Sequence, residues 1–282
     1  LLFDATTSRS RRVKNRLASI WMLGALVVAV IPLALVIGYV LLEGIGQLSV
    51  AWFTEDLPAV TRKAGGGMGP AVVGTLFITL GAAVMAIPLG ILGAIYLHEY
   101  GAKGRTARLI RFMADVMTGV PSIVMGLFVY TVVVARFKSF SGYAGVVALA
   151  LIVIPVVIRT TENMLVLVPA SLREAAYALG TPKWKVIIMV TLRAARAGVI
   201  TGVLLAVARI AGETAPLLFT ALNNQFWNAD LSKPMASLPV TIFKFAMSPY
   251  ENWQKLAWAG VFLITAGVLA LNILARVLFR QR

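Results

Sequence analysis

The sequence predicts an all-α, polytopic membrane protein with six membrane-spanning helices. Hydrophobic residues make up 60% of the 282 residues and charged residues only 13%, whereas soluble domains average about 45–50% and 25%. Six apolar runs of 16 to 26 residues alternate with polar segments, and such lengths suit a bilayer. The expected spans are Leu17–Leu42, Val72–Leu97, Phe112–Ala135, Tyr143–Ile158, Ala197–Leu222 and Leu256–Ala275.

The first span is too long for the core of a signal peptide and has no small-residue cleavage site after it, so it is expected to be an anchor. Four glycines line the second span and allow close helix packing, namely Gly74, Gly81, Gly90 and Gly93. Gly119-Val120-Pro121 interrupts the third span. Prolines and small residues in most spans fit a bundle that changes shape.

Polar residues accompany the third and fourth spans. Asp115, Thr118 and Ser122 share a helical face beside the break in the third span, and Asp115 is expected to pair with Arg111 at i−4. The fourth span is short and is allowed to begin near Ser141. Its last polar residues, 160–163, are expected only to cap its emergence into water.

The basic residues sort to one side of the membrane. With these spans, eighteen Lys and Arg residues fall on one side and seven on the other, and Arg209 is the remaining one of the 26. The positive-inside bias puts both termini in the cytoplasm. The net charge of +15 is spread over loop ends with no aromatic-interleaved basic stretch, so we expect membrane lipid rather than nucleic acid as the partner.

A short helix is expected at about residues 169–180, on the cytoplasmic side. Pro169 suits a first helical turn, Gly180 a left-handed stop, and Pro182 forbids continuation. Four small or apolar residues at i, i+3, i+4 and i+7 form one narrow face, namely Leu172, Ala175, Ala176 and Leu179. The helix either lies on its own protein or is gripped by a partner from the water.

The fifth span has a polar face. At 100° per residue, its small and polar residues fall near one line, namely Gly198, Gly202, Arg209, Glu213, Pro216 and Thr220. Arg209 near mid-span costs about 2.5–3.5 kcal/mol on insertion scales. Either Glu213 at i+4 neutralises it as an in-helix pair, or Arg209, Glu213 and Thr220 face a water-filled path. In that path Arg209 would donate hydrogen bonds to an oxyanion, and Glu213 would accept a hydrogen bond from the hydroxyl group of a protonated phosphate.

The chain shows no enzyme active site and no cofactor site of its own. No Walker sequence is present, so any ATP and Mg²⁺ must be bound by partner subunits. Cys is absent, and His98, the single histidine, is expected to lie at the membrane interface. No cluster has metal-ligand spacing, and no Ser, His and Asp triad can be assembled.

The residues around the short helix carry a family resemblance. Glu174-Ala175-Ala176, Gly180, Val190 and Leu192 resemble the EAA loop of bacterial ABC-importer permeases, whose usual form is EAA, Gly, Ile, Leu, Pro at this spacing. Val190 replaces the Ile and Arg193 the final Pro. In this resemblance the coupling residues are Arg173, Glu174, Ala175, Ala176 and Gly180.

Three longer segments, 173–185, 208–218 and 238–249, resemble the phosphate-specific permeases of the PstA type. The resemblance runs from the first span to the last and is weakest before Pro70. It implies a type I importer (MetI-like) transmembrane domain over residues 17–279, between a basic cytoplasmic segment, 1–16, and a tail, 280–282. The short helix would be the coupling helix.

The resemblance also implies partners in the bacterial cytoplasmic membrane. These are a PstC-type permease, a PstB-type ATPase dimer that binds ATP and Mg²⁺, and a PstS-type protein that delivers inorganic phosphate. The partner permease is either a second gene product or another copy of this chain. The alternatives are a permease for sulfate, molybdate or an organic nutrient, a secondary transporter or channel that uses Arg209, Glu213 and Asp115 as a proton relay, and an intramembrane enzyme.

Overall fold

The computed structural model describes residues 9–59, 65–101 and 104–278. The regular structure in these ranges is helical throughout, which confirms the predicted all-α class. Five helices are long and apolar enough to cross a membrane, and a bent pair supplies the sixth span. Positions 1–8 of the predicted basic segment and the predicted tail at 280–282 lie outside the described residues.

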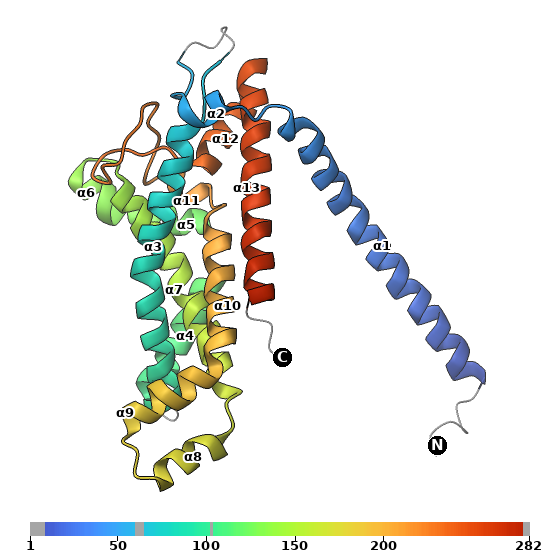
Figure 1. Ribbon diagram of the computed structural model, residues 1–282, viewed down its shortest axis with the longest axis vertical. Coiled ribbons are helices and arrows are strands. Elements are labelled where there is room, and N and C mark those ends of the chain that lie inside the picture. The colour runs from blue at the N-terminus through green and yellow to red at the C-terminus, as the bar shows by residue number, and fades with distance from the viewer. Residues whose placement is uncertain (1–8, 60–64, 102–103, 279–282) are drawn as a thin grey trace.

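Helix α1 (Arg9–Ile45) leans away from the rest of the bundle (Figure 1). It meets α13 (Glu251–Leu278) only near its C-terminal end, where the Tyr39 and Trp258 rings contact edge to face at 5.0 Å. Gly44 makes this approach possible, because a Cβ there would lie 2.5 Å from Cβ of Phe262. Most of α1 therefore presents its apolar side chains to the surroundings.

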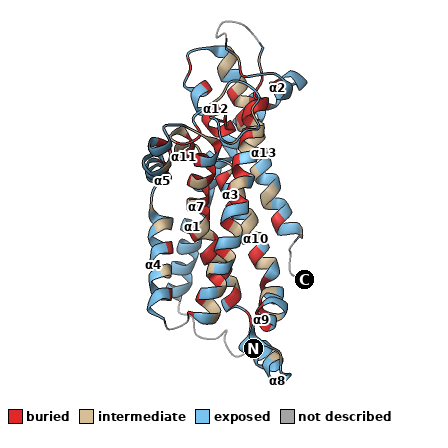
Figure 2. Ribbon diagram, turned by 90° about the vertical axis from the view of Figure 1, so that its left-hand side faces the viewer, coloured by how far each residue is buried: buried red, intermediate tan, exposed pale blue. Residues whose placement is uncertain are grey.

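Helices α3 (Gly69–Ile95) and α7 (Gly142–Val166) form the centre of the bundle. The buried residues in Figure 2 concentrate along this pair. As predicted, glycines of α3 bring the helices together: a Cβ on Gly81 would lie 2.8 Å from Val146, and one on Gly90 would lie 2.6 Å from Val157. In lipid the hydrophobic effect does not drive helices together, so their association depends on close van der Waals packing, which small residues allow.

The third predicted span is broken. Helix α4 (Arg105–Gly119) and helix α5 (Ser122–Val129) meet at 106°, and α5 continues through the π-helical turn η2 (Tyr130–Val134) into α6 (Ala135–Phe137). Val120 is extended, with φ −72° and ψ 131°, because Pro121 disfavours helical backbone at the preceding residue. The Gly119-Val120-Pro121 break thus turns the chain sharply.

Three predicted helix boundaries are wrong. Helix α7 starts at Gly142 with Ser141 as its cap, but it continues to Val166, so residues 160–163 are inside it rather than capping it. The next helix starts earlier than predicted, through α9 (Lys183–Lys185), η3 (Val186–Thr191) and α10 (Leu192–Ile210), and it ends at Ile210 instead of Leu222. Ion pairs keep the polar turn of α7 in the bundle.

The two ends of the bundle differ. Helix α8 (Ala170–Ala178) lies at one end, and α2 (Val50–Thr54), α11 (Ala215–Leu218) and α12 (Leu238–Ala246) gather toward the other (Figure 1). Trp52 is 1% exposed and its indole donates to the carbonyl of Leu256. Trp253 stacks on Phe245 with 4.7 Å between the ring centroids, so these two side chains pack together inside the protein.

Candidate translocation path and coupling surface

Arg209 lies in the last turn of α10, one residue before the helix ends at Ile210. Its side chain is 62% exposed, and its Nε atom lies 4.0 Å from Oε1 of Glu213. This distance is the limit of an ion pair, so most donors of the guanidinium remain available. The in-helix neutralisation considered from the sequence is therefore weak.

The continuous polar face predicted for residues 198–220 is wrong beyond Ile210. The amide of Glu213 donates to the carbonyl of Ile210 in a turn, and a separate helix, α11, follows. Thr220 is fully buried and its hydroxyl donates to the carbonyl of Pro216 at 2.8 Å. Thr220 thus holds the turn after α11 and does not face a path in this conformation.

Arg209 lines a cavity of about 150 Å³ that lies at the break between α4 and α5. The helix is interrupted at residues 120–121, and Thr118 and Ser122, on either side of the break, line the same cavity. The cavity combines one guanidinium with two hydroxyl groups and apolar walls, a composition suited to an oxyanion. Its lining residues are Met117, Thr118, Val120, Pro121, Ser122, Ile152, Val156 and Arg209.

A second hollow, of about 450 Å³, lies between the facing sides of α7 and α10. Gly198 and Gly202 of the predicted face line it. They also let α10 approach α7 closely, because a Cβ on Gly202 would lie 3.1 Å from Thr160 and one on Gly198 would collide with Met164. Thr160, Asn163 and Thr201 provide its polar groups. Polar groups of α7 and α10 therefore lie between Arg209 and the α8 end of the bundle.

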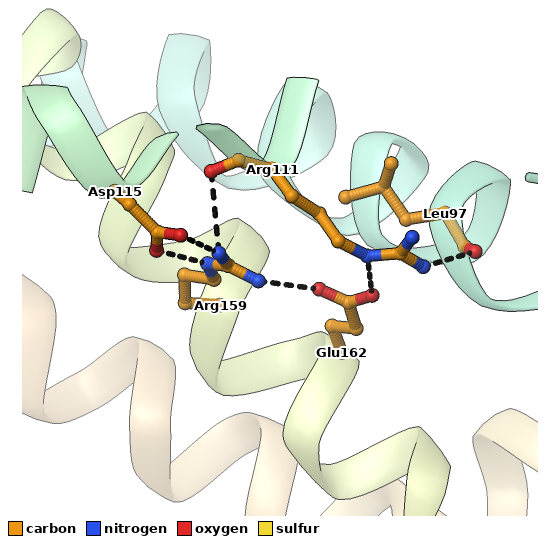
Figure 3. A network of polar contacts seen from close by, with 5 residues as sticks. All are labelled: Leu97, Arg111, Asp115, Arg159 and Glu162. Carbon is orange, nitrogen blue, oxygen red and sulfur yellow. Dashed lines mark hydrogen bonds and ion pairs between the residues drawn. The ribbon is translucent and has the colours of Figure 1, made fainter. Parts of the chain in front are cut away.

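A four-residue charge network joins α4 to α7 near the α8 end (Figure 3). Arg111 donates through Nε to Glu162 at 2.7 Å and through Nη2 to the carbonyl of Leu97 at 2.8 Å. Arg159 donates to Glu162 at 3.2 Å and, through Nε and Nη2, to both carboxylate oxygens of Asp115. The predicted Asp115 to Arg111 pair is wrong, because each residue pairs with α7 instead.

Helix α8 ends as the sequence predicts. Gly180 has a φ of +74°, the amide of Thr181 donates to the carbonyl of Ala176, and the amide of Gly180 donates to the carbonyl of Tyr177. These two bonds form a Schellman motif, which favours glycine at this position. None of the residues of α8 is buried, and Leu179 is 86% exposed. The helix is thus presented to the water rather than to its own bundle.

Arg173 is the member of α8 that turns back to the bundle. Its Nη1 atom lies 3.1 Å from Nε2 of His98 and 3.4 Å from Oε1 of Glu99, in the π-helical turn η1 (Tyr96–Tyr100) that ends α3. Lys183 donates to the carbonyl of Glu99 at 2.8 Å and lies over the ring of Tyr100. Glu174, by contrast, is exposed.

Residues 86–281 match the family of binding-protein-dependent transport system inner membrane components. The chain belongs to this family. It is 57% identical to the phosphate transport system permease protein PstA of Yersinia pestis over 286 aligned residues, covering 99% of this chain and 97% of the relative. The PstA of Pasteurella multocida is 49% identical, covering 96% of each chain. Within the family, the chain groups with the PstA permeases.

Solved permeases share the fold. An inward-facing MetNI methionine ABC transporter superposes with a TM-score of 0.60 at 17% identity, over 76% of this chain and 94% of the other. An amino acid ABC transporter gives a TM-score of 0.56 at 16% identity, over 74% and 91%. The type I importer architecture expected for this permease is therefore confirmed, and it is a multi-pass protein of the inner membrane.

Sequence reasoning missed the central role of α7 in the polar interior of this permease. Glu162 is 9% exposed and lies between two arginines, although its stretch reads as an ordinary helix end. His98 is 11% exposed and contacts Arg173 of α8. The available signal was the repeat of charged residues three or four apart in two neighbouring spans, Arg111 with Asp115 and Arg159 with Glu162.

Proposed function

We propose that this chain is a permease subunit of an ATP-driven importer and forms part of the path for inorganic phosphate across the bacterial cytoplasmic membrane. The observation that supports phosphate as the substrate is the 57% identity, over nearly the whole chain, to a protein named for phosphate transport. The exposed guanidinium of Arg209 at a cavity beside the broken helix supports it.

In this proposal Arg209 donates to the phosphate oxygens and Glu213 accepts a hydrogen bond from a protonated phosphate hydroxyl. Hydrogen phosphate carries such a hydroxyl and sulfate at neutral pH does not, so a carboxylate acceptor would favour phosphate by leaving sulfate opposed to a negative charge. Glu213 is 16% exposed and 4.0 Å from Arg209, which places both charges within reach of one small anion.

Energy enters through α8. The ATPase dimer, of the PstB type, holds ATP and Mg²⁺ and grips the exposed face around Glu174, Ala175 and Ala176, while Gly180 fixes the end of the helix. A PstC-type permease completes the path and a PstS-type protein delivers phosphate from outside. Both termini then lie in the cytoplasm. Closure of the ATPases would shift the bundle between its inward-open and outward-open states.

Uptake of radiolabelled phosphate by the reconstituted transporter tests the role of Arg209. Arg209→Gln should lower uptake at least about tenfold, because a charge-assisted contact to the anion is lost. Arg209→Lys should retain part of it, since the charge remains and the fork is lost. Arg136→Gln, in the short helix α6 after η2, is the control. Unchanged uptake in Arg209→Gln would remove Arg209 from the path.

A secondary transporter is the competing class. It predicts uptake that collapses with a proton ionophore and needs no ATPase subunit, whereas our proposal predicts uptake that follows ATP. The exposure of most of α8 favours an external partner, because none of its residues is fully buried against its own chain. Assays with sulfate and molybdate in the same vesicles separate the cargo alternatives.

A further inference from the structure

The two carboxylates that hold Arg159 are unequal. Glu162 is 9% exposed and is bound by both Arg111 and Arg159, so it is fixed inside the bundle. Asp115 is 60% exposed, and the bond partner of its carboxylate within the described residues is Arg159. Glu162 therefore belongs to the scaffold, whereas Asp115 can turn into water at low cost because an exposed ion pair contributes little.

The pair of Asp115 and Arg159 lies next to the Arg209 cavity. Thr118 lines that cavity, and its hydroxyl donates to the carbonyl of Asp115 at 2.8 Å. On α7, Val156 lines the cavity and Arg159 follows it by three residues, roughly 4.5 Å along the helix and on nearly the same face. Because α7 runs on into α8, the pair is the next charged step from the cavity toward the ATPase end.

The geometry of the pair is that of an occupied anion site. Arg159 presents Nε and Nη2 side by side, and they donate to the two oxygens of Asp115. A phosphate offers two oxygens to the same fork. The third nitrogen, Nη1, stays on Glu162 at 3.2 Å, so Arg159 keeps its orientation when the partner on the fork is exchanged.

We propose that Arg159 is a second oxyanion-binding group, which Asp115 occupies while the path is empty and yields to phosphate arriving from the Arg209 cavity. The inference rests on the proposed phosphate path. The exchange leaves Arg159 paired at each stage, which avoids an uncompensated charge in the bundle. Since phosphate must compete with a tethered carboxylate, the site binds weakly, which suits release toward the cytoplasm.

Equilibrium binding of radiolabelled inorganic phosphate to the complete, purified transporter without ATP tests this exchange. Asp115→Asn removes the competing charge and should tighten phosphate binding about fivefold, the change that corresponds to losing a partly exposed ion pair. Arg159→Gln added to Asp115→Asn should abolish the gain. Asp115→Ser repeats the test with a smaller neutral group, should the amide rearrange the network.

The matched control is Asp230→Asn in the outer loop. Asp230 also faces a basic residue, with its Oδ2 atom 3.8 Å from Nζ of Lys233. Hydrogen bonds from Ser232 lower the pKa of Asp230, so this carboxylate is charged at neutral pH. This control should leave phosphate affinity unchanged, because its pair lies at the opposite end of the bundle from α8.

Two results would overturn the exchange: phosphate binding that is unchanged or weaker in both Asp115 variants, or a gain that persists when Arg159 is replaced. A purely structural role for the pair predicts only weaker binding and a lower melting temperature. If Arg209→Gln lowers phosphate uptake while the Asp115 variants bind normally, the exchange fails and the proposed function stands. If the unmodified transporter binds no phosphate, the proposed function itself fails.

Discussion

Arg173 of α8 reaches Glu99 at the end of α3, with 3.4 Å between Nη1 and Oε1. Glu99 is 6% exposed and Arg173 is 26% exposed, so the pair is shielded from salt better than a surface pair. Lys183 fixes the same turn through the carbonyl of Glu99. Helix α8 and the start of α9 are thus both attached to the end of α3, a central helix of the bundle.

Loosening this contact should reduce the transport obtained per ATP. We expect Glu99→Gln to lower phosphate uptake about fivefold at unchanged ATPase binding, the effect of losing about 1 kcal/mol of a partly shielded pair. Uptake and ATP hydrolysis measured in the same vesicles give the ratio. Glu251→Gln, which removes an exposed pair with Lys255, is the control. An unchanged ratio in Glu99→Gln would mean that α8 moves α3 by another contact.

The end of α8 gives a second prediction. Gly180→Val should cost about 1–2 kcal/mol, because a β-branched residue is strained at a φ of +74°, and a nine-residue helix has little stability to spare. Gly180→Asn should be tolerated, since Asn adopts left-handed backbone readily. Co-purification of the ATPase subunits should fall only with Val. Equal retention with both would show that the end of α8 is not gripped.

The end of α8 was predictable because its signals are local. Gly180 and Pro182 lie within four residues of Ala178, the last residue of α8, and the structure confirms the stop. The network around Glu162 was not predictable, because its partner Arg111 lies 51 residues away in the sequence. The hydropathy of one segment contains no information about ion pairs between different helices. Hydropathy therefore ended the fourth span early, at the first polar turn.

The error in the fifth span has a different cause. A helical wheel assumes that the helix continues, and the apolar composition of residues 197–222 by itself predicts one uninterrupted span. Gly212 and Pro216, four residues apart, were the available sign, since both weaken a helix interior. Helix α10 ends at Ile210 and α11 begins at Ala215, so Gly212 lies in the break and Thr220 is buried beyond it, apart from the face of Arg209.

Thr220 accordingly gives a stability prediction. Thr220→Val keeps the shape but leaves the carbonyl of Pro216 without its donor, which should cost about 1 kcal/mol of folding free energy. Thr220→Ser keeps the hydroxyl and should retain the bond, with a smaller loss from the missing methyl group. Melting in detergent reports the first effect, and phosphate affinity should stay constant in both. A lost affinity with normal melting would restore Thr220 to the path.

The contact of α3 with the loop before α12 gives the last prediction. A Cβ on Gly74 would collide with the backbone carbonyl of Ala236, and Met235 lies 2.8 Å away on the same side. The backbone cannot move aside as a flexible side chain can, so Gly74→Ala should destabilise the end of the bundle opposite α8 by about 1–3 kcal/mol. Gly24→Ala in α1 meets nothing within 4 Å and should be neutral or stabilising, because alanine is the better helix former. Melting temperatures of the two variants, purified side by side, should therefore shift in opposite directions or for Gly74→Ala alone. If Gly74→Ala melts like the unmodified protein, α3 and this loop are not in the close contact seen here.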